Sequence, residues 1–120
     1  RLAELHHRFN DANIIAESNT FGIAQIESLQ MAGLPVTAFD TSRASKNQII
    51  SALELALENH SIELLQDEIL INEMESYEII SHNDGIPSYS APSGLHDDCV
   101  IALALAWHGA STSVSVIFEV

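Results

Sequence analysis

The chain has 120 residues, of which 47% are hydrophobic, and this is enough for one buried core but too little for two ordinary domains. Its formal net charge is −13 with only four lysine and arginine residues, which excludes a broad cationic surface for phosphate binding. The single cysteine, Cys99, excludes an internal disulfide, and no apolar run approaches the roughly 18 residues of a membrane span. We therefore expect one compact, soluble domain over residues 1–120, in a reducing compartment.

The first third of the chain alternates between helical and extended patterns. Residues 2–9 carry apolar side chains at helical spacing, and residues 14–16 form a short apolar run that ends at Glu17 before a polar turn. Apolar spacing predicts a second helix over residues 23–31, and residues 36–39 are typical of another strand. Glu17 is therefore expected at the end of a strand.

The middle of the chain contains the strongest helical signal. Ser45 with Gln48 has the spacing of a capping box, and an apolar stripe follows it, formed by Ile49, Ile50, Leu53 and Leu57. Residues 62–65 predict a short strand, Asp67 is a candidate helix cap, and residues 77–81 are typical of an extended segment. Strands and helices thus continue to alternate.

The last third contains a polar loop and a strongly apolar helix. Residues 82–94 are rich in turn residues and predict a loop or loose hairpin, with a strand over residues 88–91. Asp97 or Asp98 then opens a helix that is apolar almost all round, so we expect it to be buried against the sheet. Alternation over residues 113–116 predicts a terminal strand. Elements in this order predict an α/β fold with helices on both faces of a sheet.

Carboxylates stand at the edges of two apolar elements: Glu17 after residues 14–16, and the Asp97-Asp98 pair before residues 100–107. A carboxylate at such a boundary must reach water, accept hydrogen bonds or bind a cation. For the aspartate pair the alternative is a helix N-cap with a favourable dipole interaction, and for Glu17 it is an exposed strand end. The local sequence leaves both explanations open.

Oxygen ligands of this kind suit hard cations. Mg²⁺ and Mn²⁺ prefer carboxylates, and phosphodiester cleavage by a pair of such ions needs no protein nucleophile. The sequence contains neither the GxSxG elbow of serine hydrolases nor a glycine-rich phosphate loop. The residues therefore fit metal-dependent hydrolysis better than a serine triad, and any ATPase function must lie elsewhere.

In order and spacing, several segments resemble phage terminase large subunits. They are residues 14–22 (IIAESNTFG), Ser45-Lys46 at a helix start, residues 62–64, and residues 89–98 (YSAPSGLHDD) before an apolar helix. The most specific part is residues 94–106 (GLHDDCVIALALA) when ESNTFG precedes it. The resemblance covers residues 14–107, which is most of the chain.

The resemblance implies the C-terminal nuclease domain of such a terminase. It implies a ribonuclease H-like fold, a mixed sheet with helices on both faces, and a metal-dependent endonuclease that cuts concatemeric double-stranded DNA with two Mg²⁺ or Mn²⁺ ions. Glu17 matches the family's second acidic ligand, and Asp97 and Asp98 match its last acidic position, with Asp98 preferred as the principal ligand. The implied partners are an ATPase domain, a small terminase subunit and a portal, in the cytoplasm of a bacterial host.

Three further residues are candidates for DNA contact. Lys46 matches a lysine common in the family at this helix start, and with Arg43 it is expected to meet DNA phosphates; a solvated pair of cations is the alternative. His96 is expected to orient an aspartate or approach the scissile phosphate, and packing within a turn is the alternative. The adjacent His6 and His7 are interpreted as surface residues, because neighbours on a helix do not face the same way.

The chain also departs from the family pattern. The family's first catalytic aspartate lies on a strand upstream of the region where this chain begins, and Asp40 does not match that position. We therefore expect an N-terminally truncated domain with weakened metal binding and an exposed sheet edge that favours self-association. The alternatives are a catalytically silent remnant or interaction module, favoured by the acidic surface, and another ribonuclease H-like nuclease such as a junction resolvase.

Overall fold

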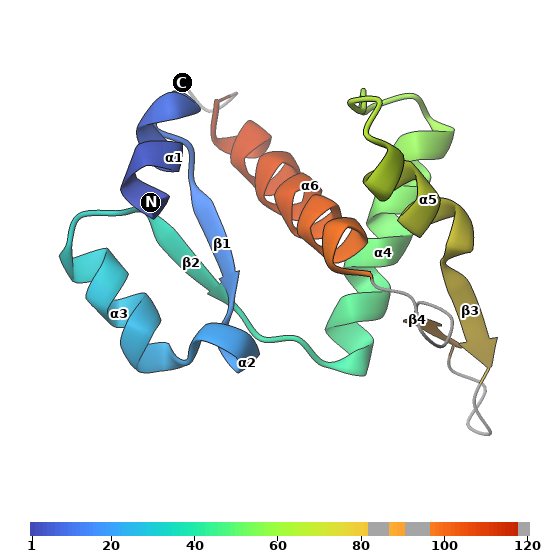
Figure 1. Ribbon diagram of the computed structural model, residues 1–120, viewed down its shortest axis with the longest axis horizontal. Coiled ribbons are helices and arrows are strands. Elements are labelled where there is room, and N and C mark those ends of the chain that lie inside the picture. The colour runs from blue at the N-terminus through green and yellow to red at the C-terminus, as the bar shows by residue number, and fades with distance from the viewer. Residues whose placement is uncertain (82–86, 91–96, 118–120) are drawn as a thin grey trace. The chain divides into compact units, whose positions relative to one another are not determined.

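A computed structural model describes residues 1–81, 87–90 and 97–117 of the chain (Figure 1). These residues divide into two compact units, Arg1–Ser42 and Arg43–Val120, and each unit is described by itself. The α/β class expected from the sequence is confirmed, since helices accompany strand pairs in both units. Among the described residues, no helix combines the length and hydropathy that a membrane crossing requires.

The first unit is built on two parallel strands that are connected through two helices. Its elements are α1 (Leu2–Arg8), β1 (Ile14–Glu17), α2 (Ser18–Phe21), α3 (Ile23–Met31) and β2 (Val36–Phe39). Strands β1 and β2 pair in parallel with Ile14 opposite Val36 and Glu17 opposite Phe39. The carboxyl ends of both strands therefore lie at the same edge, and Glu17 stands at that edge.

The small core of this unit depends on how α3 ends. Gly33, at φ 91°, donates its N–H to the carbonyl of Gln30, and Leu34 donates its N–H to the carbonyl of Leu29. This pair of bonds is a Schellman motif, which needs a residue at positive φ and therefore favours glycine. The turn brings Leu34 against a core cluster formed by Ala16, Ile26 and Val36, together with Ile14 and Leu29.

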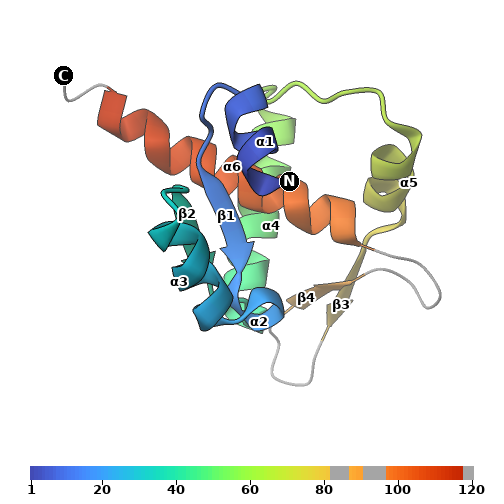
Figure 2. The same cartoon turned by 60° about the vertical axis from the view of Figure 1, so that its left-hand side comes forward.

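The second unit pairs two long helices. Its elements are α4 (Arg43–Glu58), α5 (Glu68–Ser76), β3 (Glu78–Ser81), β4 (Pro87–Ser90) and α6 (Asp98–Ile117). Helix α6 lies beside α4 and also contacts α5, as Figure 2 shows. Both helices have buried apolar side chains: Ile49, Ile50, Leu53, Ala56, Val100, Ala104 and Leu105. Strands β3 and β4 form an antiparallel pair in which Ile79 lies opposite Tyr89.

Most expected elements are confirmed, and three expectations are wrong. Residues 62–65 form no strand, because no neighbouring strand pairs with this short segment in the described part of the chain. Residues 113–116 continue α6 as helix, since four alternating residues cannot outweigh a long helix that runs through Gly109. Helix α4 begins at Arg43, so Ser45 lies within its first turn instead of forming the expected capping box.

Two other expectations need qualification. Helix α6 buries Val100, Ala104 and Leu105 as expected, but its main neighbours within the second unit are helices and not strands. One mixed sheet was also expected, whereas the strands of the described residues form two separate pairs, one parallel and one antiparallel. Asp67 does cap α5, since its Oδ1 accepts a hydrogen bond from the Leu70 N–H at 3.1 Å.

The two leucines of α4 provide a test of this packing. Leu53 is 3% exposed and Leu55 is 57% exposed. Leu53→Ala should lower the free energy of unfolding by about 2–5 kcal/mol because it leaves a cavity at the buried face of α4. Leu55→Ala, the matched control, should change it by about 0.5 kcal/mol or less. Urea denaturation followed by circular dichroism measures both, and equal losses would contradict the assignment of α4's buried face.

Candidate functional site

Glu17 is held at the carboxyl edge of the parallel strand pair. It is the last residue of β1, and its side chain is partly exposed. Its Oε2 accepts a hydrogen bond from the Thr41 hydroxyl at 2.9 Å, from the segment that follows β2. This bond fixes one carboxylate oxygen in direction while the side chain keeps access to water, which is an arrangement suited to a metal ligand.

The segment around Thr41 is itself fastened to the residues that follow Glu17. Asn19 forms two hydrogen bonds with the Thr41 backbone: its Nδ2 donates to the Thr41 carbonyl at 3.2 Å, and its Oδ1 accepts from the Thr41 N–H at 2.9 Å. The Ser18 hydroxyl donates to the Phe39 carbonyl at 3.3 Å. The Glu-Ser-Asn sequence thus supplies one carboxylate and two side chains that brace the loop beside it.

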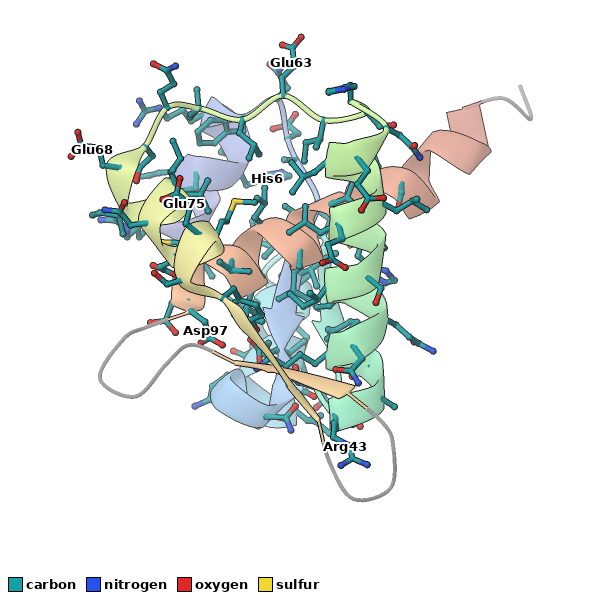
Figure 3. All side chains as sticks on the ribbon, turned by 90° about the vertical axis from the view of Figure 1, so that its right-hand side faces the viewer. His6, Arg43, Glu63, Glu68, Glu75 and Asp97 are labelled. Atoms are coloured by element: carbon teal, nitrogen blue, oxygen red, sulfur yellow. The ribbon has the colours of Figure 1, made fainter. Side chains whose placement is uncertain are left out.

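The second unit places Asp97 immediately before α6. Its carbonyl accepts the hydrogen bond of the Ile101 N–H at 3.0 Å, which starts the helix. Its Oδ2 accepts hydrogen bonds from Lys46 Nζ at 3.4 Å and from the Tyr77 hydroxyl at 3.3 Å. Figure 3 shows Asp97 where α6 begins. Three elements of this unit therefore converge on one carboxylate.

The Tyr77 hydroxyl is kept in its protonated form. Burial, together with the charge and hydrogen bond of the Asp97 carboxylate, raises the pKa of the Tyr77 phenol above its usual range. The Lys46 ammonium also lies 6.0 Å from the centre of the Tyr77 ring, at the distance of a cation–π contact. Tyr77 therefore stays a hydrogen-bond donor to Asp97 at neutral pH, next to a cation that offsets the carboxylate's charge.

Asp98 and Cys99 form the first turn of α6. Asp98 is exposed, and its negative charge is favourable at a helix N-terminus. The Cys99 N–H donates to Glu73 Oε1 at 3.0 Å, so a glutamate of α5 satisfies one of the free N–H groups at this end. Glu73 also raises the pKa of the Cys99 thiol, chiefly through a hydrogen bond. The thiol is therefore not activated as a nucleophile.

The remaining expected site residues are distributed as follows. Arg43 is exposed at the start of α4 (Figure 3), and Lys46 lies one turn further along and faces Asp97. Glu17 belongs to the first unit, whereas Asp97 and Asp98 belong to the second. His96 lies outside the described residues.

Known proteins resemble this chain over most of its length. No protein-family model matches it. The large terminase subunit of Thermus phage G20c is 29% identical over 108 residues, which is 89% of this chain, and the large terminase subunit of Thermus virus P23-45 matches equally. The crystal structure of the G20c large terminase nuclease with bound cobalt superposes with a TM-score of 0.79 at 28% identity and covers 90% of this chain. The chain is homologous to phage large terminase nuclease domains.

The homology has a defined extent. The chain spans 22% of the length of the two curated terminase subunits and 58% of the crystallised G20c nuclease. The G20c nuclease with bound magnesium and the nuclease domain of Thermus phage P74-26 both superpose with TM-scores of 0.75. Two of the G20c nuclease structures contain a divalent cation, cobalt in one and magnesium in the other. The carboxylates of this chain are of the ligand type that such cations prefer.

The structure also identifies residues that the sequence patterns did not suggest. Thr41 donates to Glu17, Asn19 holds the Thr41 backbone, and Tyr77 donates to Asp97. The signal for Thr41 was present in the sequence, because Glu17 and Thr41 both follow strands that a parallel pairing brings to the same edge. No sequence signal marked Tyr77, which makes its contact across 20 positions of the chain.

Alkaline unfolding tests the Tyr77 contact. A tyrosine whose pKa is raised by folding contributes stability that is present below the unfolded pKa of about 10 and is lost as pH rises above it. Tyr77→Phe should cost about 1 kcal/mol at neutral pH, since the bond is long and only partly buried. Between about pH 9 and pH 11 the parent should lose more stability than the variant, by at most about 1 kcal/mol per pH unit after solvent screening. Denaturant titrations at the two pH values measure this difference, and parallel losses would exclude the contact.

Proposed function

We propose that this chain is part of the metal-dependent endonuclease domain of a viral DNA-packaging terminase large subunit. The observation that carries the proposal is the homology to large terminase subunits over 89% of the chain. Carboxylates also stand at the second and last acidic positions that the resemblance implies. The proposed fold is ribonuclease H-like, with one mixed sheet, and residues 1–120 form a single partial domain. The proposed substrate is concatemeric double-stranded DNA.

Glu17, Asp97 and Asp98 are the proposed ligands for Mg²⁺ or Mn²⁺. Two bound ions of this type would supply an activated water and stabilise the leaving oxygen in phosphodiester hydrolysis. The chain's own residues hold and orient: Thr41 fixes one oxygen of Glu17, and Lys46 and Tyr77 fix one oxygen of Asp97. Asp98 is exposed and keeps its carboxylate accessible to a cation. Carboxylate oxygens are the donors that hard cations select, so the residues present fit these ions.

DNA contact is proposed for Arg43, Lys46 and His96. With a formal charge of −13 and four lysine and arginine residues, the chain offers few groups that can neutralise phosphates. Arg43 is exposed at the start of α4 and is suited to a phosphate contact. Lys46 lies 3.4 Å from Asp97, so a phosphate that binds Lys46 would also approach the proposed metal ligands.

The proposed partners follow from the same homology. They are the terminase ATPase domain, the small terminase subunit and the portal, and the proposed location is the cytoplasm of a bacterial host. Self-association is also proposed, because several large apolar side chains of the described residues face solvent, among them Met31 at 89% and Leu65 at 85% exposure.

The decisive experiment combines metal binding with DNA cleavage. Calorimetric titration of Mn²⁺ and nicking of plasmid DNA are measured on the parent and on a triple variant, Glu17→Ala, Asp97→Ala, Asp98→Ala. Loss of these ligands should abolish Mn²⁺ binding and any nicking. The control is a second triple variant, which removes the same charge from exposed helical positions and should bind Mn²⁺ and nick DNA as the parent does. Its changes are Glu27→Ala, Glu54→Ala and Glu58→Ala.

The outcomes separate the candidate functions. Binding and nicking that disappear only in the ligand variant support the endonuclease. Binding that disappears without any nicking by the parent supports a catalytically silent remnant, which the strongly acidic charge of the chain favours as the second candidate. Absence of Mn²⁺ binding by the parent would contradict the proposal that these carboxylates form a metal site.

The Thr41 hydroxyl gives a finer test of the same site. Thr41→Val removes the hydrogen bond to Glu17 and retains the shape of the side chain. Loss of an orienting partner typically weakens metal binding by about 10–100-fold, so the Mn²⁺ dissociation constant should rise by that factor. Thr37→Val, the same change at an exposed position of β2, should leave it unaltered. Equal affinities for both variants in calorimetry would mean that Thr41 does not position Glu17.

A further inference from the structure

A second cluster of potential metal ligands lies at the end of α1. His6, His7 and Asp11 each offer one ligand atom, and these atoms all lie within 4.8 Å of one another. His6 Nε2 is 3.6 Å from Asp11 Oδ1, and His7 Nδ1 is 2.9 Å from the same oxygen. The proposed endonuclease makes no use of these residues.

The backbone after α1 creates the cluster. Asn10 and Asp11 both adopt positive φ, at 59° and 56°, which turns the chain back toward the helix it has just left. Asparagine and aspartate are the non-glycine residues that accept this conformation most readily. The turn carries the Asp11 carboxylate over the last turn of α1, and the rings of His6 and His7 approach to 5.1 Å between centroids. Their adjacency in the helix therefore does not keep them from sharing one partner.

The hydrogen bond of His6 prepares its ring for coordination. His6 Nδ1 lies 2.8 Å from the Ala12 carbonyl oxygen, which can only accept, so Nδ1 carries the proton. In the neutral ring Nε2 then has a free lone pair, and this is the nitrogen near Asp11. Histidine ligands of metals usually donate their other ring N–H to a carbonyl or a carboxylate in this way. The His6 side chain is 11% exposed, so its orientation is held by packing as well.

We propose that His6, His7 and Asp11 form a binding site for a divalent transition-metal ion, with Zn²⁺ as the reference ion. Two imidazoles and one carboxylate suit Zn²⁺, Co²⁺, Ni²⁺ or Cu²⁺, whereas Mg²⁺ selects sites made of oxygen ligands. Ligand atoms about 3.4 Å apart are expected around a tetrahedral ion with bonds of about 2.1 Å, and the distances of 2.9 and 3.6 Å lie on either side of this value. On binding, the ion would take the place of the proton between His7 Nδ1 and Asp11, and the neutral His7 ring would carry its one proton on Nε2.

The site has a structural consequence within the first unit. Its ligands come from the last turn of α1 and from the turn that leads to β1, so a bound ion cross-links the two segments. Asp11 and His7 are 70% and 74% exposed, which leaves the remaining coordination positions to water or to a ligand from another molecule. An ion that binds the folded chain and not the unfolded chain raises the unfolding temperature.

The test is calorimetric titration of Zn²⁺ on the full chain and on matched variants. His7→Gln keeps a polar side chain suited to a helix, and Asp11→Asn keeps a residue that tolerates positive φ. Each should weaken Zn²⁺ binding by at least about tenfold, which corresponds to about 1.4 kcal/mol. The control is His60→Asn, since His60 is an exposed histidine like His7 and has a positive φ, 54°, like Asp11. The control should keep the parent affinity, and circular dichroism confirms that each variant is folded.

Two further arms separate this site from the carboxylates of the proposed endonuclease. Excess Mg²⁺ should not displace Zn²⁺, and the variant Glu17→Ala, Asp97→Ala, Asp98→Ala should keep its Zn²⁺ affinity and its rise in unfolding temperature on Zn²⁺ addition. The proposal is overturned if the parent binds no Zn²⁺, if His7→Gln and Asp11→Asn bind it as the parent does, or if the carboxylate variant loses it. Because Zn²⁺ binding is read without any DNA, failure of the endonuclease proposal leaves this result unaffected.

Discussion

A carboxylate that leaves bulk water must find hydrogen-bond donors or a cation, and this constraint organises the functional part of both units. Among the described residues no charged side chain is fully buried, and the partly buried carboxylates have identified donors. Glu17 accepts from Thr41, Asp97 accepts from Lys46 and Tyr77, and Glu73 accepts from the Cys99 backbone. The loops and helix ends of the chain are consequently arranged around acidic side chains.

This arrangement connects the acidic composition with the proposed chemistry. Glu17 and Asp97 each accept hydrogen bonds through one carboxylate oxygen, so the orientation of the carboxylate is set before a cation binds. Preorganisation of this kind lowers the cost of binding and is what a hydrolytic metal site requires. The homology to terminase nucleases supports the proposed activity, and the local geometry suits the carboxylates that we propose as ligands.

The sequence predicted the elements that long apolar patterns define and missed those that depend on distant partners. Helix α3 and strand β2 have the bounds that apolar spacing indicated, and Asp67 caps α5 as expected. Residues 62–65 and 113–116 were wrongly predicted as strands, because short runs take their conformation from neighbours that the local pattern does not contain. The proposed ligands Glu17 and Asp97 could be named from their motifs, but the Tyr77 contact crosses 20 positions and has no local signature.

The bond between Glu73 and Cys99 makes the only cysteine of the chain a reporter of helix docking. A thiol reacts with alkylating reagents as its thiolate, and a nearby carboxylate suppresses that form. While α5 contacts the start of α6, Glu73 holds the pKa of the Cys99 thiol above its usual value, so alkylation should be slower than after Glu73 moves away. Because Asp97 lies two residues before Cys99, the rate of alkylation follows the integrity of the helix terminus next to that aspartate, without any added probe.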